Sequence, residues 1–208
     1  MSDSNLAVPE LGGVEIHGIT RGAFVLKSAL AAGAVYGAAT VGPFVGRAMA
    51  QSGGGDVEIV NFALTLEYLE ADFYAKAGSL GLSGDLKKLA KQFGGEETEH
   101  VDALTATVKK LGGTPAKKPT FTFPIKDEQS FLKLAQTLED TGVAAYNGAA
   151  PAIQSKEVLG AAGSIVQIEA RHAAAIRLRR KEPPAPDAFD KTLEKSAVLK
   201  AVQPLIKA

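Results

Sequence analysis

Four segments of the chain carry apolar residues at helical spacing. In the first, residues 57–76, six apolar positions fall on one helical face: Ile59, Phe62, Ala63, Leu66, Leu69 and Phe73. Capping and stop signals delimit the other three, which run from Asp85 to Gly112, from Asp127 to Pro151, and from Ser155 to the basic run at residues 177–181. Four helices of this length predict an all-α four-helix bundle, and we expect residues 187–206 to add a short C-terminal helix.

The connections predict how the four helices are joined. Short turns link the first helix to the second and the third to the fourth, so each pair forms an antiparallel hairpin. Residues 112–126, GGTPAKKPTFTFPIK, join the two pairs and contain three prolines. Fifteen extended residues reach about 50 Å, whereas a 25-residue helix is about 38 Å long. We therefore expect a long crossover along the bundle between the second and third helices.

The two halves of the chain share a repeat with an offset of 72 residues. The repeated positions form four pairs: Glu67 with Glu139, Tyr74 with Tyr146, Glu97 with Glu169, and His100 with His172. Most neighbouring residues do not match. A packing repeat would preserve apolar positions, but these are acids, histidines and tyrosines, which a core normally excludes. The repeat therefore indicates shared chemistry, and the alternative is a solvated acidic face on each helix.

The spacing of the repeated acids and histidines is that of a metal ligand set. Glu97 and His100 are three residues apart, so their side chains lie on one face of the helix and can bind the same ion. Glu169 and His172 repeat this arrangement in the second half. We predict that each histidine serves a different ion of a dinuclear centre.

The remaining carboxylates complete this prediction. Glu97 and Glu169 each have two oxygens and can bridge the two ions, while Glu67 and Glu139 hold the outer sides. Four carboxylates balance the charge of two divalent cations. Without metal, such a buried cluster repels itself and is partly protonated.

Four nearby side chains allow other assignments. Glu70 can share the face of Glu67, but Gly142 stands at the repeat-related position, so the repeat favours Glu67 as the ligand and predicts little effect of Glu70→Ala. Glu96 lies four residues before His100, and its lack of a repeat counterpart predicts an exposed or supporting role. The repeated tyrosines either hydrogen-bond a ligand carboxylate or donate an electron, or they are core residues with satisfied hydroxyls: Tyr74 and Tyr146.

Composition excludes several kinds of site. The 23 basic and 23 acidic residues cancel, so no broad positive charge attracts a nucleic acid. The chain has no cysteine, which excludes thiolate zinc sites and cysteine-ligated iron–sulfur clusters. The methionines, Met1 and Met49, precede the predicted domain, which excludes a methionine-ligated haem. The ligands must be oxygen and nitrogen, and these suit both iron and manganese.

Residues 21–51 have the layout of an export signal. A basic start and a long apolar run precede Ala48 and Ala50, which makes Gln51 the expected first residue after cleavage. TRGAFVLK, residues 20–27, resembles a twin-arginine export signal with one arginine in place of two. The alternative is an uncleaved membrane anchor, because residues 28–45 carry no charge and meet the roughly 17-residue minimum for a span.

The domain organisation follows from these segments. We predict an export signal or N-terminal anchor at residues 1–50, a linker at 51–56 and one helical domain at 57–208. The expected location is the periplasm, the cell envelope or the extracellular space, with a membrane contact only through an uncleaved N-terminal segment.

The order Glu, Glu-x-x-His, crossover, Glu, Glu-x-x-His resembles the ferritin-like di-iron and di-manganese carboxylate proteins. ALTLEYLEADFY, residues 63–74, and the tail at 187–206 are similar to exported bacterial ferritin-like domain proteins, which are related to plant desiccation-associated proteins. One departure is Gly94-Gly95 within the second predicted helix. Two glycines there cost about 1 kcal/mol each relative to alanine, and they favour a kink beside the ligands.

This resemblance implies an oxidoreductase with two Fe or two Mn ions. Its substrate is O2 or H2O2, and Fe(II) if the protein is a ferroxidase. The sequence does not separate a ferroxidase from a peroxidase or manganese catalase. A non-catalytic metal-binding or stress-related module of the envelope is the alternative, and a homo-oligomer, including an iron-storage shell, is compatible with the sequence.

Overall fold

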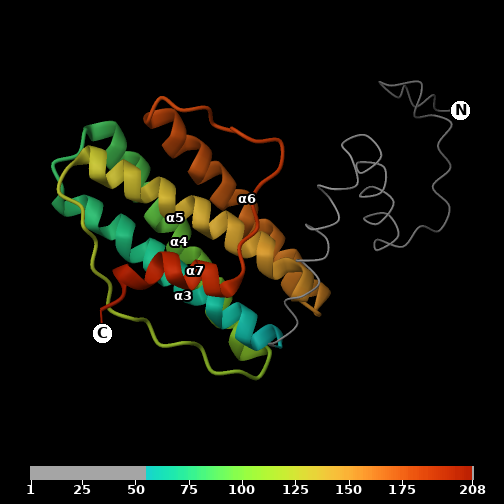
Figure 1. Ribbon diagram of the computed structural model, residues 1–208. Helices are drawn as coiled ribbons and strands as arrows, with labels where there is room; N and C mark the ends of the chain where they lie inside the picture. The colour runs from blue at the N-terminus through green and yellow to red at the C-terminus, as the bar shows by residue number, and fades with distance from the viewer. Residues whose placement is uncertain (1–54, 208) are drawn as a thin grey trace, which may run out of the picture. The chain divides into compact units, whose positions relative to one another are not determined.

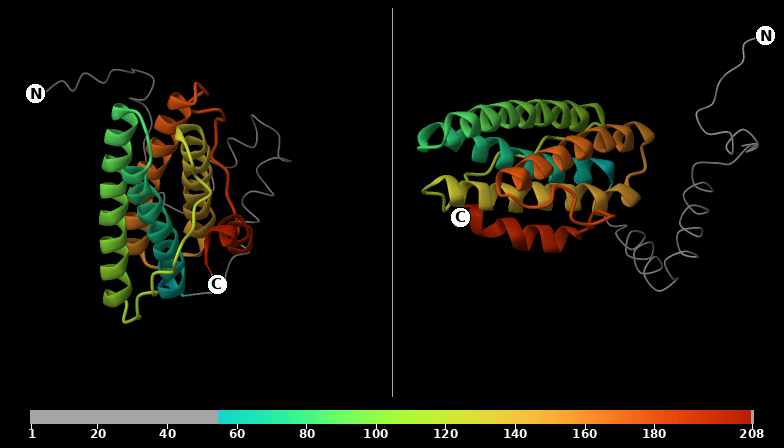
Figure 2. Two further views of the ribbon diagram at one scale, coloured as in Figure 1. Left: turned by 90° about the vertical axis from the view of Figure 1, so that its left-hand side faces the viewer. Right: turned by 90° about the horizontal axis from the view of Figure 1, so that it is seen from above.

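A computed structural model describes residues 55–207 of the chain. Four long helices lie side by side (Figure 1): α3 (Asp56–Lys76), α4 (Gly84–Lys110), α5 (Glu128–Ala149) and α6 (Lys156–Arg179). A shorter helix, α7 (Lys195–Val202), lies alongside α5 (Figure 2). In this part of the chain the sole β-type pairing is an isolated bridge between Phe121 and Ile206. The predicted all-α bundle with a short C-terminal helix is confirmed.

Short 3-10 helices follow three of the α-helices. Their bounds are Ala77–Ser79 for η2, Ala150–Ala152 for η3 and Gln203–Leu205 for η4. The segments containing η2 and η3 are the turns of the two hairpins, α3 with α4 and α5 with α6, whose helices pack closely together. The predicted pairing of the helices is therefore correct.

The segment between α4 and α5 crosses the length of the bundle, as predicted. Near the start of α3, Asn61 holds this crossover with two hydrogen bonds, from its Nδ2 to the Thr114 carbonyl at 3.0 Å and from the Ala116 N–H to its Oδ1 at 2.7 Å. Near the end of α3, Phe123 of the crossover packs edge-on against Phe73, with ring centroids 5.4 Å apart. The crossover thus follows α3 from one end to the other.

The C-terminal segment closes over this crossover. Thr122 donates its N–H to the Leu205 carbonyl at 2.8 Å, and Lys207 donates to the Thr120 carbonyl at 2.9 Å. Within α7, Val198 and Val202 are buried in the same apolar cluster as Phe131 of α5. The short helix therefore completes the core on the α5 side.

Two of the predicted helix starts are confirmed. Asp127 caps α5, because its side chain accepts the Ser130 N–H at 2.8 Å while the Ser130 hydroxyl accepts the Asp127 N–H at 3.1 Å. Ser155 caps α6 and accepts the Val158 N–H at 3.3 Å. Each cap satisfies N–H groups that the first turn of a helix leaves free.

The other predicted cap, Asp85, is wrong by two residues. Gly55 and Ser83 occupy the N-cap positions of α3 and α4, so Asp56 and Asp85 lie in the first turns. The Asp56 carboxylate is used elsewhere: it accepts the N–H groups of Gln154 and Ser155, at 2.8 and 2.7 Å. Its negative charge therefore ties the start of α3 to the loop before α6.

Two apolar clusters fill the bundle. Along α3, Val60 and Leu64 belong to one cluster, and Leu69 and Phe73 belong to the other. Glu67 lies between them in the sequence and is fully buried. A buried polar layer therefore interrupts the core at the level of Glu67.

The predicted export signal or anchor falls outside the described residues, and it stays a prediction. Among residues 55–207, no helix has both the length and the apolarity needed to span a membrane.

Candidate metal centre

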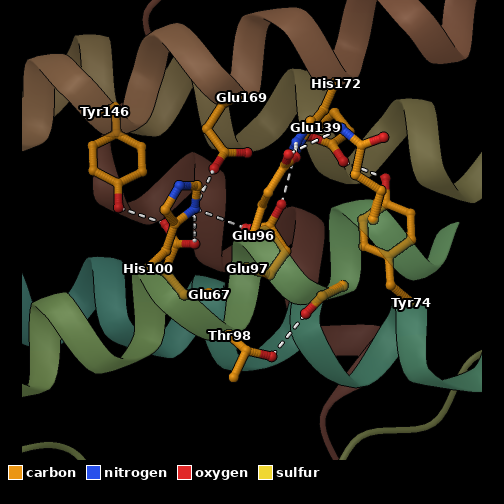
Figure 3. Close-up of polar contacts among 12 residues, drawn as sticks. Glu67, Tyr74, Glu96, Glu97, Thr98, His100, Glu139, Tyr146, Glu169 and His172 are labelled. Carbon is orange, nitrogen blue, oxygen red and sulfur yellow. Dashed lines mark hydrogen bonds and ion pairs between the residues drawn. The ribbon is translucent and has the colours of Figure 1, made fainter. Parts of the chain in front are cut away.

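The six predicted ligands converge in the middle of the bundle (Figure 3). They come from all four long helices: Glu67 from α3, Glu97 and His100 from α4, Glu139 from α5, and Glu169 and His172 from α6. Each of the four glutamates is 0% exposed. Burying four carboxylates without cations costs several kcal/mol for each charge. These carboxylates therefore need protons or cations that neutralise them.

One half of the site is grouped around His100. Its Nδ1 atom lies 3.2 Å from Glu67 Oε2, 3.0 Å from Glu97 Oε2 and 3.2 Å from Glu169 Oε1. The side chain of His100 is 12% exposed, so this half lies nearer to solvent than the carboxylates do.

The other half is grouped around His172, which is only 2% exposed. Its Nδ1 atom lies 2.9 Å from Glu97 Oε1 and 3.4 Å from Glu139 Oε2. These contacts have ion-pair distances, but Nδ1 and both oxygens lack a well-aligned hydrogen bond. Such atoms are available as ligands.

The cluster contains two groups of residues that could each hold a metal ion. The first potential ligand group is Glu67, Glu97, His100 and Glu169, and the second is Glu97, Glu139, Glu169 and His172. Within each group the ligand atoms lie within 4.8 Å of one another, and ligands about 2.1 Å from one ion are at most about 4.2 Å apart. Small side-chain movements would therefore close either group around a cation. Glu97 and Glu169 belong to both groups, and their bridging role stays a prediction.

Without metal, bound protons offset the negative charge of the carboxylate cluster. Burial by itself raises the pKa of Glu97, but the neighbouring imidazoles of His100 and His172 outweigh burial and lower this pKa to about 2. Burial raises the pKa of Glu67 to about 7, although the hydrogen bond from His100 partly offsets it.

The two histidines are charged in this state. Burial alone lowers the pKa of His100, but hydrogen bonds to Glu169, Glu67 and Glu97 raise it to about 12. For His172, the nearby carboxylates of Glu139 and Glu97 likewise overcome burial and raise the pKa to about 11. Positively charged imidazoles thus occupy the role that metal ions would take.

The repeated tyrosines lie at the two ends of the cluster and bind ligand carboxylates of the opposite half (Figure 3). Tyr74 donates its hydroxyl hydrogen to Glu139 Oε1, and Tyr146 donates to Glu67 Oε1. The predicted hydrogen bonds to these carboxylates are therefore present, and each fixes the orientation of a carboxylate that could bind metal. Gly94 permits one of these placements, because a Cβ at this position would lie 3.0 Å from the Cβ of Tyr74. The helix α4 continues through Gly94 and Gly95 without interruption.

Glu96 has a supporting role for the second histidine rather than for His100. Its Oε2 lies 2.6 Å from His172 Nε2, while Gln92 Nε2 donates to its Oε1 at 3.0 Å. Phe93 stacks on the His172 ring, with centroids 3.9 Å apart. A partner at Nε2 fixes the ring orientation and leaves Nδ1 facing the carboxylates. Sequence reasoning missed Phe93, although its place four residues before Glu97 puts it near the same helical face.

Glu70 is the second residue that the sequence reasoning set aside. It is 2% exposed, and burial followed by repulsion from Glu169 raises its pKa well above the usual range. Glu70 has no counterpart in the repeat, yet Glu70 and Glu67 are buried together on one face of α3. The signal that could have identified it is Gly142 itself, whose missing side chain leaves space next to Glu70.

Comparison with known proteins agrees with this architecture. The sequence model of a family described as a ferritin-like domain matches residues 55–182. Among solved structures, the fold is similar to that of a conserved hypothetical protein from Mycobacterium tuberculosis, with a TM-score of 0.57 and 16% identity over 64% of this chain and 96% of the other. No curated protein sequence matches the chain. The likeness to the solved structure concerns the fold, and the buried carboxylate and histidine cluster that could hold a metal is a feature of this chain.

Proposed function

This chain belongs to the ferritin-like family, and on that premise we propose that it is an exported oxidoreductase with a dinuclear iron or manganese centre. The observation that carries the proposal is the pair of ligand groups that share Glu97 and Glu169. Glu97 and Glu169 would hold the two ions close enough for one substrate molecule to reach both. When bound, the ions would supply one electron each, which matches the two electrons needed to reduce H2O2 to water.

The chain contributes ligands, charge and a dry environment. Glu67 and Glu139 would hold the outer sides of the two ions, and the neutral Nδ1 atoms of His100 and His172 would complete the ligand groups. The apolar clusters on both sides of the polar layer exclude water, which strengthens every electrostatic interaction inside. The partly exposed His100 marks the side from which a small substrate such as O2 or H2O2 would enter.

The tyrosines have a positioning role in this proposal. Tyr74 and Tyr146 keep one oxygen of Glu139 and of Glu67 occupied, so that the other oxygen of each carboxylate faces the histidines. Burial and the adjacent carboxylates raise the pKa of both tyrosine hydroxyls well above the usual range, so each hydroxyl keeps its proton and remains a donor. An oxidised tyrosine is a further outcome that spectroscopy can detect.

A non-catalytic metal-binding module is the alternative, and one observation favours it. All four glutamates are completely buried, and structural metal sites are usually closed whereas catalytic sites keep an open position. A structural centre would bind metal and stabilise the fold without changing its oxidation state.

Steady-state turnover distinguishes these functions. We would load the mature domain with Mn(II) or Fe(II) and measure H2O2 consumption, and separately Fe(II) oxidation by O2. Oxidoreductase function predicts turnover that Glu67→Ala and Glu139→Ala each abolish, with the helical content of both variants unchanged. Full metal loading with no turnover of either substrate would contradict the oxidoreductase and favour the non-catalytic metal-binding module.

A further inference from the structure

Glu70 is a buried carboxylate that the two ligand groups do not include. It is 2% exposed, and its Oε2 has no hydrogen-bond partner among the described residues. A charged or polar side chain left unpaired in a protein interior is costly. Glu70 therefore needs a partner that the protein side chains around it do not provide.

Gly142 creates the space that Glu70 occupies. A Cβ built on Gly142 would lie 3.2 Å from Glu70 Oε1 and 3.4 Å from Glu169 Oε2. These two carboxylate oxygens thus lie around one point, and Glu169 is a member of both ligand groups. Glu70 reaches into the cluster through a gap that any larger residue at position 142 would narrow.

The repeat makes this contact asymmetric. Position 142 is the counterpart of position 70, so one half of the site has a glutamate three residues after its outer ligand and the other half has a glycine. Two glutamates at these positions would compete for the same space beside Glu169. The glycine is therefore the complement of Glu70 and not a sign that Glu70 lies outside the site.

We propose that Glu70 is a fifth carboxylate ligand of the metal centre, placed beside Glu169 in the gap left by Gly142. This inference rests on the dinuclear centre of the proposed function, and it replaces the sequence-based expectation that Glu70→Ala has little effect. Five carboxylates with two neutral imidazoles carry one negative charge more than two divalent ions neutralise. Glu70 therefore favours a centre in which one ion is trivalent, and its loss shifts the midpoint potential upward.

The test measures the affinity of the metal-free protein for Mn(II) at neutral pH by calorimetry. For Glu70→Gln we expect the affinity of at least one of the two sites to fall about tenfold or more. The matched control is Glu99→Gln, which removes an exposed charge two residues from Glu97. Gly142→Ala should also weaken binding, whereas Gly163→Ala, where a Cβ meets nothing within 4 Å, should not.

A second measurement separates a ligand from a merely structural residue. Glu70→Gln keeps the shape of the side chain and removes a buried ionisable group, so the metal-free variant should melt at the same temperature as the original protein or higher. The iron-loaded variant should show the higher midpoint potential. An unchanged Mn(II) affinity in both Glu70→Gln and Gly142→Ala, or a lower melting temperature with unchanged affinity, would overturn the inference.

The result also distinguishes this inference from the proposed function. Two bound Mn(II) ions, weakened by Glu70→Gln but without turnover of H2O2 or Fe(II), would support the ligand role and overturn the oxidoreductase. An original protein that binds no Mn(II) or Fe(II) would overturn both.

Discussion

Tyr74 of α3 donates a hydrogen bond to Glu139 of α5, across the two halves of the repeat. The reciprocal contact, from Tyr146 of α5 to Glu67 of α3, is also present. Each half of the chain therefore supplies the residue that orients the outer carboxylate of the other half. Neither half can form a complete group by itself, because each group contains carboxylates from both halves.

The reciprocal tyrosine contacts lead to a first prediction. Tyr74→Phe and Tyr146→Phe each remove one hydrogen bond to a buried carboxylate and leave the ring packing in place. We expect each variant to lower metal affinity by about tenfold, because partners of metal ligands contribute on that scale. Metal competition assays measure this, with Tyr68→Phe on α3 as the control. Equal affinity in all three variants would show that the tyrosines do not orient the ligands.

The second prediction concerns metal content. We expect about two Fe or Mn ions per chain, and His100→Ala or His172→Ala should cause both ions to be lost, because Glu97 and Glu169 connect the two ligand groups. Elemental analysis of the purified protein and the two variants provides the measurement. One zinc ion per chain, unaffected by either substitution, is the result that contradicts a dinuclear centre.

The third prediction follows from the raised pKa values of the histidines. In the metal-free protein the pKa is about 12 for His100 and about 11 for His172, so both imidazoles are protonated at pH 7. A metal ion requires the neutral form, and binding must therefore release at least two protons, so that apparent affinity rises with pH. Calorimetry in buffers with different ionisation enthalpies counts these protons. Binding without proton release between pH 6 and pH 8 would contradict the charged-histidine state.

Export is the subject of the fourth prediction, which concerns residues outside the described range. Cleavage after Ala50 should give a native protein whose N-terminus is at or near Gln51, found outside the cytoplasm. Mass spectrometry of protein from fractionated cells measures this directly. An intact Met1 in a soluble cytoplasmic fraction is incompatible with export, and an intact N-terminus in the membrane fraction would identify the segment as an anchor.

The sequence by itself determined the helical architecture and which residues share a helical face in the candidate site. Helix periodicity, the caps at Asp127 and Ser155 and the proline-containing crossover are local features, so the four helices and their connections could be derived from the sequence alone. The 72-residue offset identified Glu67, His100 and their counterparts because spacing along a helix fixes which side chains share a face. These features depend on neighbours in the chain.

Tertiary structure decided the contacts between helices. Spacing does not give the rotation or separation of two packed helices, and these set whether Glu96 supports His100 on its own helix or His172 on α6. The same holds for Asp56, which binds the loop before α6 instead of capping its own helix. Glu70 is the clearest case: the repeat compares positions 70 and 142 as alternatives, but in space the absent side chain of Gly142 is what admits the Glu70 carboxylate. Packing rewards complementary shapes across an interface, and such complementarity leaves no repeat in the sequence.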